Sequence, residues 1–121
     1  MSDAALAIDF TGELADVWAE CSQPDWDGYN ALPVTRASCM NAERFIHALP
    51  QDVPVPCIGA EPDGHVTLQW GRSPLQVLSL SVSHRGELHY AALLGTGRAC
   101  GTEPFADAVP AVILNLIRQV S

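Results

Sequence analysis

Residues 78–92 read LSLSVSHRGELHYAA, and their pattern predicts the centre of the fold. Before the His84-Arg85-Gly86 segment, leucine and valine alternate with serine, and after it an apolar residue again occupies every second position. Such period-two alternation is typical of a strand with one buried face. Two such strands joined by a short segment that contains glycine predict a β-hairpin.

The register of this hairpin follows from the faces that its side chains must share. A two-residue turn at Arg85-Gly86 would place Val82 opposite His89 and mix polar with apolar positions. A three-residue loop over 84–86 pairs Val82 with Leu88 and keeps the apolar residues on one face. It also places the glycine where a bulge requires a left-handed backbone. We therefore expect the three-residue loop.

The flanking sequence extends the hairpin into an antiparallel sheet. Residues 57–60 and 65–70 surround Glu61-Pro62-Asp63-Gly64, a tight-turn sequence, and residues 65–70 again alternate apolar with polar. Residues 98–102 are expected to add a short edge strand. The prediction is a sheet of four to five strands whose even-numbered positions form an apolar face.

A first helix is predicted ahead of the strands. Thr11 is its candidate N-cap, although a start near Ser2 or Asp3 is also compatible with the sequence, and it should end before Pro24. Its apolar positions recur at helical spacing, with acidic residues between them: Leu14, Val17, Trp18 and Cys21.

Two further helices are expected. The first, capped by Thr35 or Ser38, should run to about Leu49 and bury Cys39, Ala42, Phe45, Ile46 and Leu49. The second is the C-terminal helix, with Asp107 as candidate cap and Pro110 in its first turn. Its apolar stripe comprises Val109, Val112, Ile113, Leu116, Ile117 and Val120.

These elements predict an α+β fold of order α-α-β-β-β-β-(β)-α in one domain, residues 1–121. Residues 1–50 form the helical part, 51–105 the antiparallel sheet and 106–121 the C-terminal helix. Two layers, with the helices on the apolar face, bury this pattern best. The opposite face is polar and either solvated or a binding surface: His65, Thr67, Gln69, Ser79, Ser81, Ser83, Glu87 and His89.

The composition excludes several classes of function. The 121 residues include 14 Asp and Glu against 6 basic residues, all arginine, for a formal net charge of −8. We expect no direct nucleic-acid binding, because that requires clustered positive charge, and no membrane partner. The N-terminus lacks the features of a secretion signal, and no window is apolar enough for a membrane span. A cytoplasmic protein with four reduced cysteines in apolar surroundings is expected.

No motif of the sequence indicates catalysis or a cofactor. Cys39, His47 and Cys57 lack the spacing of metal ligands, so neither a metal nor a cofactor is expected. The hairpin register pairs Ser81 with His89, but an open strand face offers no oxyanion hole. We therefore expect a non-enzymatic protein. The alternative is a small enzyme or ligand-binding domain that uses the polar face around His65, Ser81 and His89.

The segment Asp25-Trp26-Asp27-Gly28-Tyr29 is the most unusual local feature. Its two rings either form an exposed interaction surface or fill the gap between the first two helices. Carboxylates are also paired at Glu61 and Asp63 and at Glu103 and Asp107, in positions typical of turns and caps.

At these motifs the chain resembles a family of small uncharacterised bacterial proteins of the proteobacterial type, with W-D-G-Y and E-P-D-G motifs. The resemblance rests on residues 26–34 (WDGYNALPV), 59–64 (GAEPDG), 68–70 (LQW), 78–82 (LSLSV) and 101–105 (GTEPF). Its members look like accessory cargo of mobile elements, which implies an antitoxin or an inhibitor of the anti-CRISPR kind.

The sequence thus predicts an acidic module that binds and neutralises a partner protein. Carboxylates would attract a basic surface, such as that of a toxin or of a nucleic-acid-binding protein complex, and aromatic rings would supply the buried anchor. A homodimer is a further possibility. The candidate partner-binding residues are Asp25, Trp26, Asp27, Tyr29, Glu61, Asp63 and Glu103.

Overall fold

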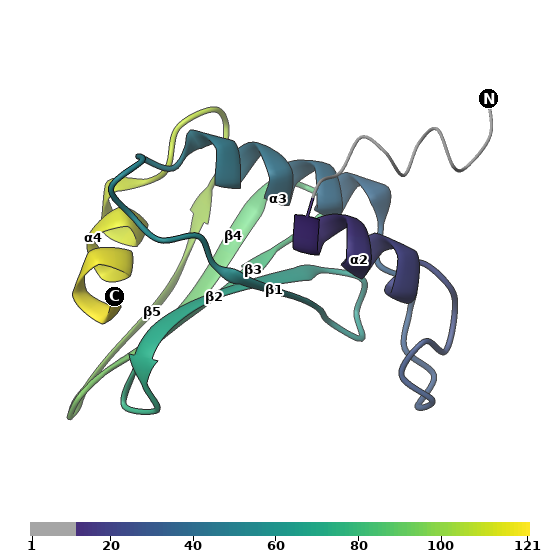
Figure 1. Cartoon of the computed structure of the whole chain (residues 1–121), viewed down its shortest axis with the longest axis horizontal. Helices are drawn as coiled ribbons and strands as arrows, with labels where there is room; N and C mark the ends of the chain where they lie inside the picture. Colours follow the sequence, from purple (N-terminus) through teal and green to yellow (C-terminus); the bar gives the residue numbers. More distant parts are fainter. Residues whose placement is uncertain (1–11) are drawn as a thin grey trace.

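The structure, a computed structural model, describes residues 12–121 (Figure 1). Its elements are α2 (Gly12–Cys21), α3 (Arg36–Ala48), β1 (Cys57–Ala60), β2 (Val66–Ser73), β3 (Gln76–Val82), β4 (Glu87–Leu94), β5 (Gly97–Pro104) and α4 (Ala111–Val120). This is the predicted α+β fold, with the optional fifth strand present. The proposed N-cap Thr11 and the earlier starts at Ser2 and Asp3 lie outside the described residues.

The five strands form one antiparallel sheet in the order β1-β2-β3-β4-β5. The predicted register of the central hairpin is confirmed: Val82 pairs with Leu88, Leu80 with Tyr90, and Leu78 with Ala92. Gly86 has the expected positive φ of 79°. β5 is longer than predicted because it continues to pair with β4 as far as Glu87 and Pro104.

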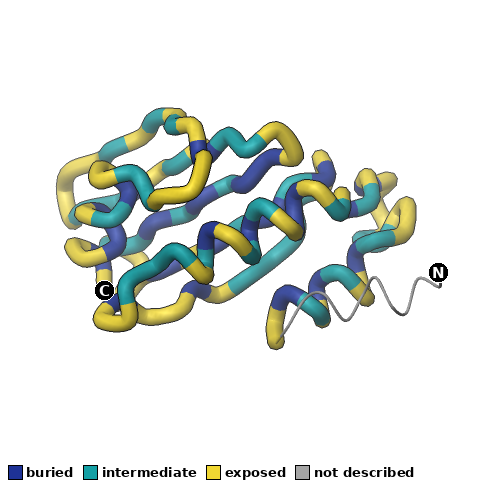
Figure 2. The backbone as a smooth tube through the Cα atoms, turned by 90° about the horizontal axis from the view of Figure 1, so that it is seen from above, coloured by how far each residue is buried: buried dark blue, intermediate teal, exposed yellow. Residues whose placement is uncertain are grey.

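Within residues 12–121 the helices cover one face of the sheet, and the core lies between the two layers (Figure 1). Figure 2 shows that buried positions recur along the strands and helices. Phe45 of α3 is fully buried, and its ring meets those of Trp70 and Phe105 edge-on at 6.2 Å and 5.5 Å. The even-numbered strand positions form the sheet side of the core: Val66, Leu68, Trp70, Leu78, Leu80, Val82, Leu88 and Ala92.

The start of the C-terminal helix differs from the prediction. Asp107 does not cap it, because its carboxylate pairs with Arg44 of α3 at 2.9 Å. The helix begins after Pro110, which is the N-cap instead of a first-turn residue and has no side-chain cap bond. Two members of the predicted stripe also differ: Val109 precedes the helix and Val112 is exposed.

Helix α3 begins directly after Thr35, one of its two predicted caps. Thr35 Oγ1 accepts a hydrogen bond from the Ser38 backbone N–H at 3.1 Å, so Thr35 is the cap. Ile46 and Leu49 were expected in the core but are only half-buried, because Ile46 lines an open space between α2, α3 and the segment before β1, and Leu49 is the C-cap at the end of α3.

The four cysteines are free thiols in two environments. Cys21 and Cys39 are buried as expected, whereas Cys57 and Cys100 are exposed. The prediction was wrong for the second pair because β1 and β5 are the edge strands of the sheet. Within residues 12–121, no helix is long and apolar enough to cross a membrane.

Candidate partner-binding site

Residues 22–33, here called the aromatic loop, connect α2 to α3 and contain the W-D-G-Y motif. The Val34 backbone N–H donates to the Cys21 carbonyl at 2.8 Å and closes the base of the loop. A second backbone bond, from Asp25 N–H to the Ala31 carbonyl at 2.8 Å, crosses the loop nearer its middle. The loop is therefore tied across at two levels.

The two aspartates of the motif hold the loop together from inside. Asp25 Oδ1 accepts the Asn30 backbone N–H at 2.6 Å. Asp27 Oδ1 accepts two backbone N–H groups, from Tyr29 at 2.8 Å and Ala31 at 3.1 Å. Asp25 and Asn30 have φ values of 60° and 64°, a left-handed conformation that few non-glycine residues adopt. The carboxylates stabilise this strained backbone, as Asx turns do.

The two rings of the motif have different environments. Trp26 is half-buried against the core, and its Nε1–H donates to the Leu32 carbonyl at 2.9 Å. Tyr29 is 87% exposed, and the neighbouring Leu32 is 58% exposed. Trp26 therefore fills a gap, which is one of the two alternatives expected for this segment. Tyr29 is exposed to solvent, which is the other.

The E-P-D-G turn lies directly beside the aromatic loop. The Leu32 backbone N–H donates to the Pro62 carbonyl at 2.8 Å, and the Thr35 N–H donates to the Gly64 carbonyl at 3.1 Å. Gly64 has φ of 93°, and a Cβ there would lie 3.0 Å from the Pro33 carbonyl oxygen. The close approach of the two segments thus requires glycine, and it brings Glu61 and Asp63 next to the loop.

Glu103 is the one predicted partner-binding residue that the structure does not place beside the loop. Glu103 is on β5 and pairs with Leu88 of β4, at the same end of the sheet as the E-P-D-G turn. Three strand spacings of about 4.8 Å separate β5 from β2, or about 14 Å. Paired residues share a face, so Glu103 is on the helix-covered side.

Charge is unevenly distributed over the described part of the chain. Two of the arginines pair with carboxylates elsewhere, Arg44 with Asp107 at 2.9 Å and Arg118 with Asp52 at 3.3 Å. Arg72 and Arg98 lie at the opposite end of the sheet. Arg36, the first residue of α3, and Arg85, in the loop between β3 and β4, lie at the same end as the E-P-D-G turn, where carboxylates outnumber them. The acidic end is formed by α2, the aromatic loop and the E-P-D-G turn, with Glu13, Asp16, Glu20, Asp25, Asp27, Glu61 and Asp63.

The E-P-D-G turn also brings His65 close to the paired carboxylates Glu61 and Asp63. One ligating atom each of Glu61, Asp63 and His65 lies within 4.8 Å of the others. His65 Nδ1 is 3.4 Å from Asp63 Oδ2, and the ring of His84 lies 6.1 Å from that of His65. The E-x-D-x-H spacing across a tight turn could have indicated the first three; His84 comes from another hairpin.

The polar face has the predicted pairing of Ser81 with His89. A hollow of about 220 Å³ lies there, lined also by Glu61, Thr67 and Ser79. His89 Nδ1 is 3.0 Å from Thr102 Oγ1, on the neighbouring edge strand. His65, the third residue of this alternative site, does not line the hollow. Ser83 is buried rather than on the surface, because its Oγ accepts the backbone N–H groups of the hairpin loop.

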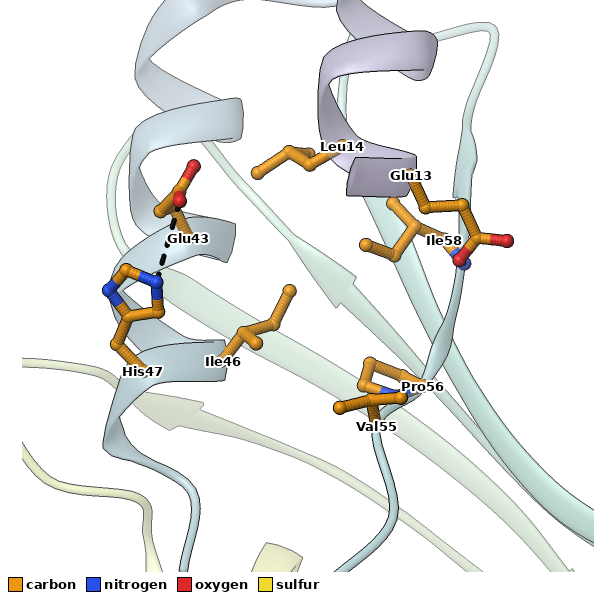
Figure 3. Close-up of a pocket in the computed structure, with 8 residues that line it drawn as sticks. All are labelled: Glu13, Leu14, Glu43, Ile46, His47, Val55, Pro56 and Ile58. Atoms are coloured by element: carbon orange, nitrogen blue, oxygen red, sulfur yellow. Dashed lines mark hydrogen bonds and ion pairs between the residues drawn. The ribbon is translucent and has the colours of Figure 1, made fainter. Parts of the chain in front are cut away.

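Figure 3 shows a second hollow, of about 180 Å³, between α2, α3 and the segment before β1. Glu43 Oε1 lies 3.5 Å from His47 Nε2, and Glu13 Oε2 accepts the Ile58 backbone N–H at 3.1 Å. Glu43 Oε2 is buried without a hydrogen-bond partner. The hollow was not predicted, since three segments of the chain build it. Its apolar lining is Leu14, Ile46, Val55, Pro56 and Ile58.

Comparison of the chain with protein-family models, with curated proteins and with solved structures finds no match.

Proposed function

We propose that the protein is a non-enzymatic module that binds a partner protein through the aromatic loop and the adjoining E-P-D-G turn. The observation that carries this proposal is the 87% exposure of Tyr29 in a loop whose backbone is fixed by hydrogen bonds. Tyrosine is enriched among the residues that dominate interface energetics. A loop that is already ordered also loses little conformational entropy on binding.

The chemistry of the partner follows from the charge around the tyrosine. Asp25 and Asp27 lie in the same loop as the tyrosine, and Glu61 and Asp63 lie in the turn that is hydrogen-bonded to this loop, so negative charge predominates near it. Such a rim favours a partner with an arginine- or lysine-rich surface and accelerates the encounter at low salt. A toxin or a nucleic-acid-binding protein complex fits this description. The protein would act on it as an antitoxin or as an anti-CRISPR-like inhibitor.

The experiment has two stages. Tagged protein captures its partner from a native bacterial lysate, and the affinity of the purified pair is then measured for the parent chain and for Tyr29→Ala. We expect Tyr29→Ala to weaken binding by about 30-fold or more, the effect of removing a hot-spot side chain. Raising the salt from about 0.05 M to about 0.5 M should weaken the parent complex at least about tenfold, because screening removes the steering charge.

Leu75→Ala is the matched control. Leu75 is 64% exposed and lies in the turn between β2 and β3, at the end of the sheet away from the aromatic loop. Its truncation should leave the affinity within about twofold, since an isolated exposed side chain contributes little. Equal losses for Tyr29→Ala and Leu75→Ala would contradict the assignment of the loop, and a salt-insensitive complex would contradict the electrostatic part.

A second candidate function is ligand binding in the 220 Å³ hollow of the polar face, where Ser81 and His89 are adjacent. β3 and β4 are interior strands, and their backbone amides pair with neighbouring strands, so no free pair of N–H groups faces the hollow. This favours binding over acyl-transfer chemistry. A thermal-shift screen with nucleotides tests it: stabilisation that His89→Ala abolishes would support this site.

A further inference from the structure

We propose that Glu61, Asp63, His65 and His84 bind a single divalent transition-metal ion, with zinc the favoured ion. The first three residues come from the E-P-D-G turn and the strand that follows it, and His84 comes from the loop between β3 and β4. The proposal rests on different observations from the proposed function, although the ion would neutralise Glu61 and Asp63, two of the carboxylates assigned to the partner-binding surface.

The distances within the turn suit a small tetrahedral ion. Ligand atoms that lie about 2.0–2.1 Å from zinc in tetrahedral geometry are about 3.3 Å from one another. His65 Nδ1 and Asp63 Oδ2 are 3.4 Å apart, which is already this spacing. Because no two ligand atoms of the three residues are more than 4.8 Å apart, the widest spacing has to shorten by at most about 1.5 Å.

The position of His84 close to His65 is not explained by the local turn. It belongs to another hairpin, yet its ring centroid lies 6.1 Å from that of His65, with the rings tilted by 41°. Two imidazoles on one tetrahedral zinc ion have centroids about 5 Å apart. His84 is exposed, so its ring can move by the remaining distance without disturbing the core. The fold thus brings a fourth ligand of the appropriate type to the three local ones.

The carboxylates are supported in the manner of metal ligands. Asp63 Oδ1 accepts the His65 backbone N–H at 3.0 Å, which leaves Oδ2 beside the imidazole. Glu61 Oε2 accepts the Thr67 hydroxyl at 2.8 Å. Hydrogen bonds of this kind orient ligating carboxylates and raise the affinity of a site.

The donor set selects the class of ion. Two carboxylates and two neutral imidazoles carry two negative charges, which a divalent ion neutralises. Mixed nitrogen and oxygen ligands suit zinc and its spectroscopic substitute cobalt(II), whereas calcium and magnesium prefer oxygen alone.

The test is a titration of the 121-residue chain after EDTA treatment and dialysis, in a background in which the exposed Cys57 and Cys100 are replaced by serine. Calorimetry with Zn²⁺ should give one ion per chain, and Co²⁺ should give the visible absorption of a tetrahedral site without thiolate ligands. His65→Gln and His84→Gln should each weaken binding at least about tenfold, because each removes a ligand.

His47→Gln is the matched control. His47 is also an exposed imidazole beside a carboxylate, with Nε2 3.5 Å from Glu43 Oε1. Its removal should leave the zinc affinity within twofold. The proposal is overturned if no stoichiometric binding occurs, if His47→Gln loses as much affinity as His65→Gln, or if His84→Gln binds like the parent. Circular dichroism of each variant verifies that the fold is intact.

Partner capture in EDTA and in zinc separates this inference from the proposed function. If the chain binds zinc but captures no partner, the metal site alone is supported. If a partner is captured in EDTA and Tyr29→Ala releases it, the proposed function is supported without the metal.

Discussion

Trp26 and Tyr29 are three residues apart in one loop, and their different environments predict different consequences of truncation. Trp26 packs against the core and donates a hydrogen bond to the Leu32 carbonyl, whereas Tyr29 is almost fully solvated. Trp26→Ala should lower the free energy of unfolding by about 1–3 kcal/mol, from lost packing and an unmade hydrogen bond. Tyr29→Ala should change it by at most about 0.5 kcal/mol. Urea denaturation measures both; equal losses would contradict this division.

Cys39 makes stability depend on pH in the alkaline range. Burial raises the pKa of its thiol from 9.0 to about 12. A proton held more tightly in the folded state stabilises fully below the unfolded pKa, so this contribution is lost as the pH rises from about 9 towards 12. The free energy of unfolding of Cys39→Ala should therefore fall less steeply across this window than that of the parent chain. The difference between the two slopes should be up to about 1.4 kcal/mol per pH unit.

The chain is suited to this measurement because it has no lysine that would titrate in the same range. Cys100→Ala, at an exposed thiol, is the control and should follow the parent curve. The prediction fails if Cys39→Ala loses stability as steeply as the parent between pH 9 and 11, measured as urea midpoints.

At the scale of elements, the central hairpin depends on Gly86. Its φ is 79°, and a Cβ there would lie 3.3 Å from the Phe105 carbonyl oxygen. Gly86→Ala should lower the free energy of unfolding by about 1–2 kcal/mol, since L-residues disfavour the left-handed region. Gly59→Ala is the matched control on β1, with ordinary φ and no atom within 4 Å of the added Cβ. Thermal unfolding should leave the control within about 0.5 kcal/mol of the parent; similar losses at both sites would contradict the prediction.

Features that local sequence specifies were predictable, whereas features that depend on distant segments of the chain were not. The register of the hairpin was predictable because alternation and a glycine lie within fifteen residues, 78–92. The extent of β5 was not, because GRACGTEP has no alternation and its pairing is determined by β4. The start of α4 was missed because the carboxylate of Asp107 binds Arg44, which is distant in sequence.

Across the whole molecule, the candidate site likewise depends on contacts between segments that are distant in the sequence. The aromatic loop and the E-P-D-G turn were each recognisable as unusual local sequences. Their adjacency depends on backbone hydrogen bonds from Leu32 and Thr35 to the turn, which no local pattern specifies. For the same reason the sequence could not separate Glu103 from this group or bring His84 to His65.

The helices and the sheet bury one continuous core, and this predicts a single unfolding transition. Phe45 of α3 contacts both Trp70 of β2 and Phe105 beyond β5, so α3 cannot detach without exposing the centre of the sheet. α2 packs on β1 and α4 on β2 to β4, and neither helix is long enough to be stable alone. The predicted single domain should therefore unfold in a two-state manner.

Urea unfolding followed by tryptophan fluorescence and by far-ultraviolet circular dichroism tests this prediction. The three tryptophans report on different places: Trp18 on α2, Trp26 on the aromatic loop and Trp70 on the sheet. The two transitions should coincide, with a slope of roughly 1–3 kcal/mol per molar urea. A fluorescence transition at lower urea that vanishes in Trp18→Phe would show that α2 unfolds separately. In that case α2 would no longer anchor the start of the aromatic loop. Tyr29 would then not be held in place for a partner.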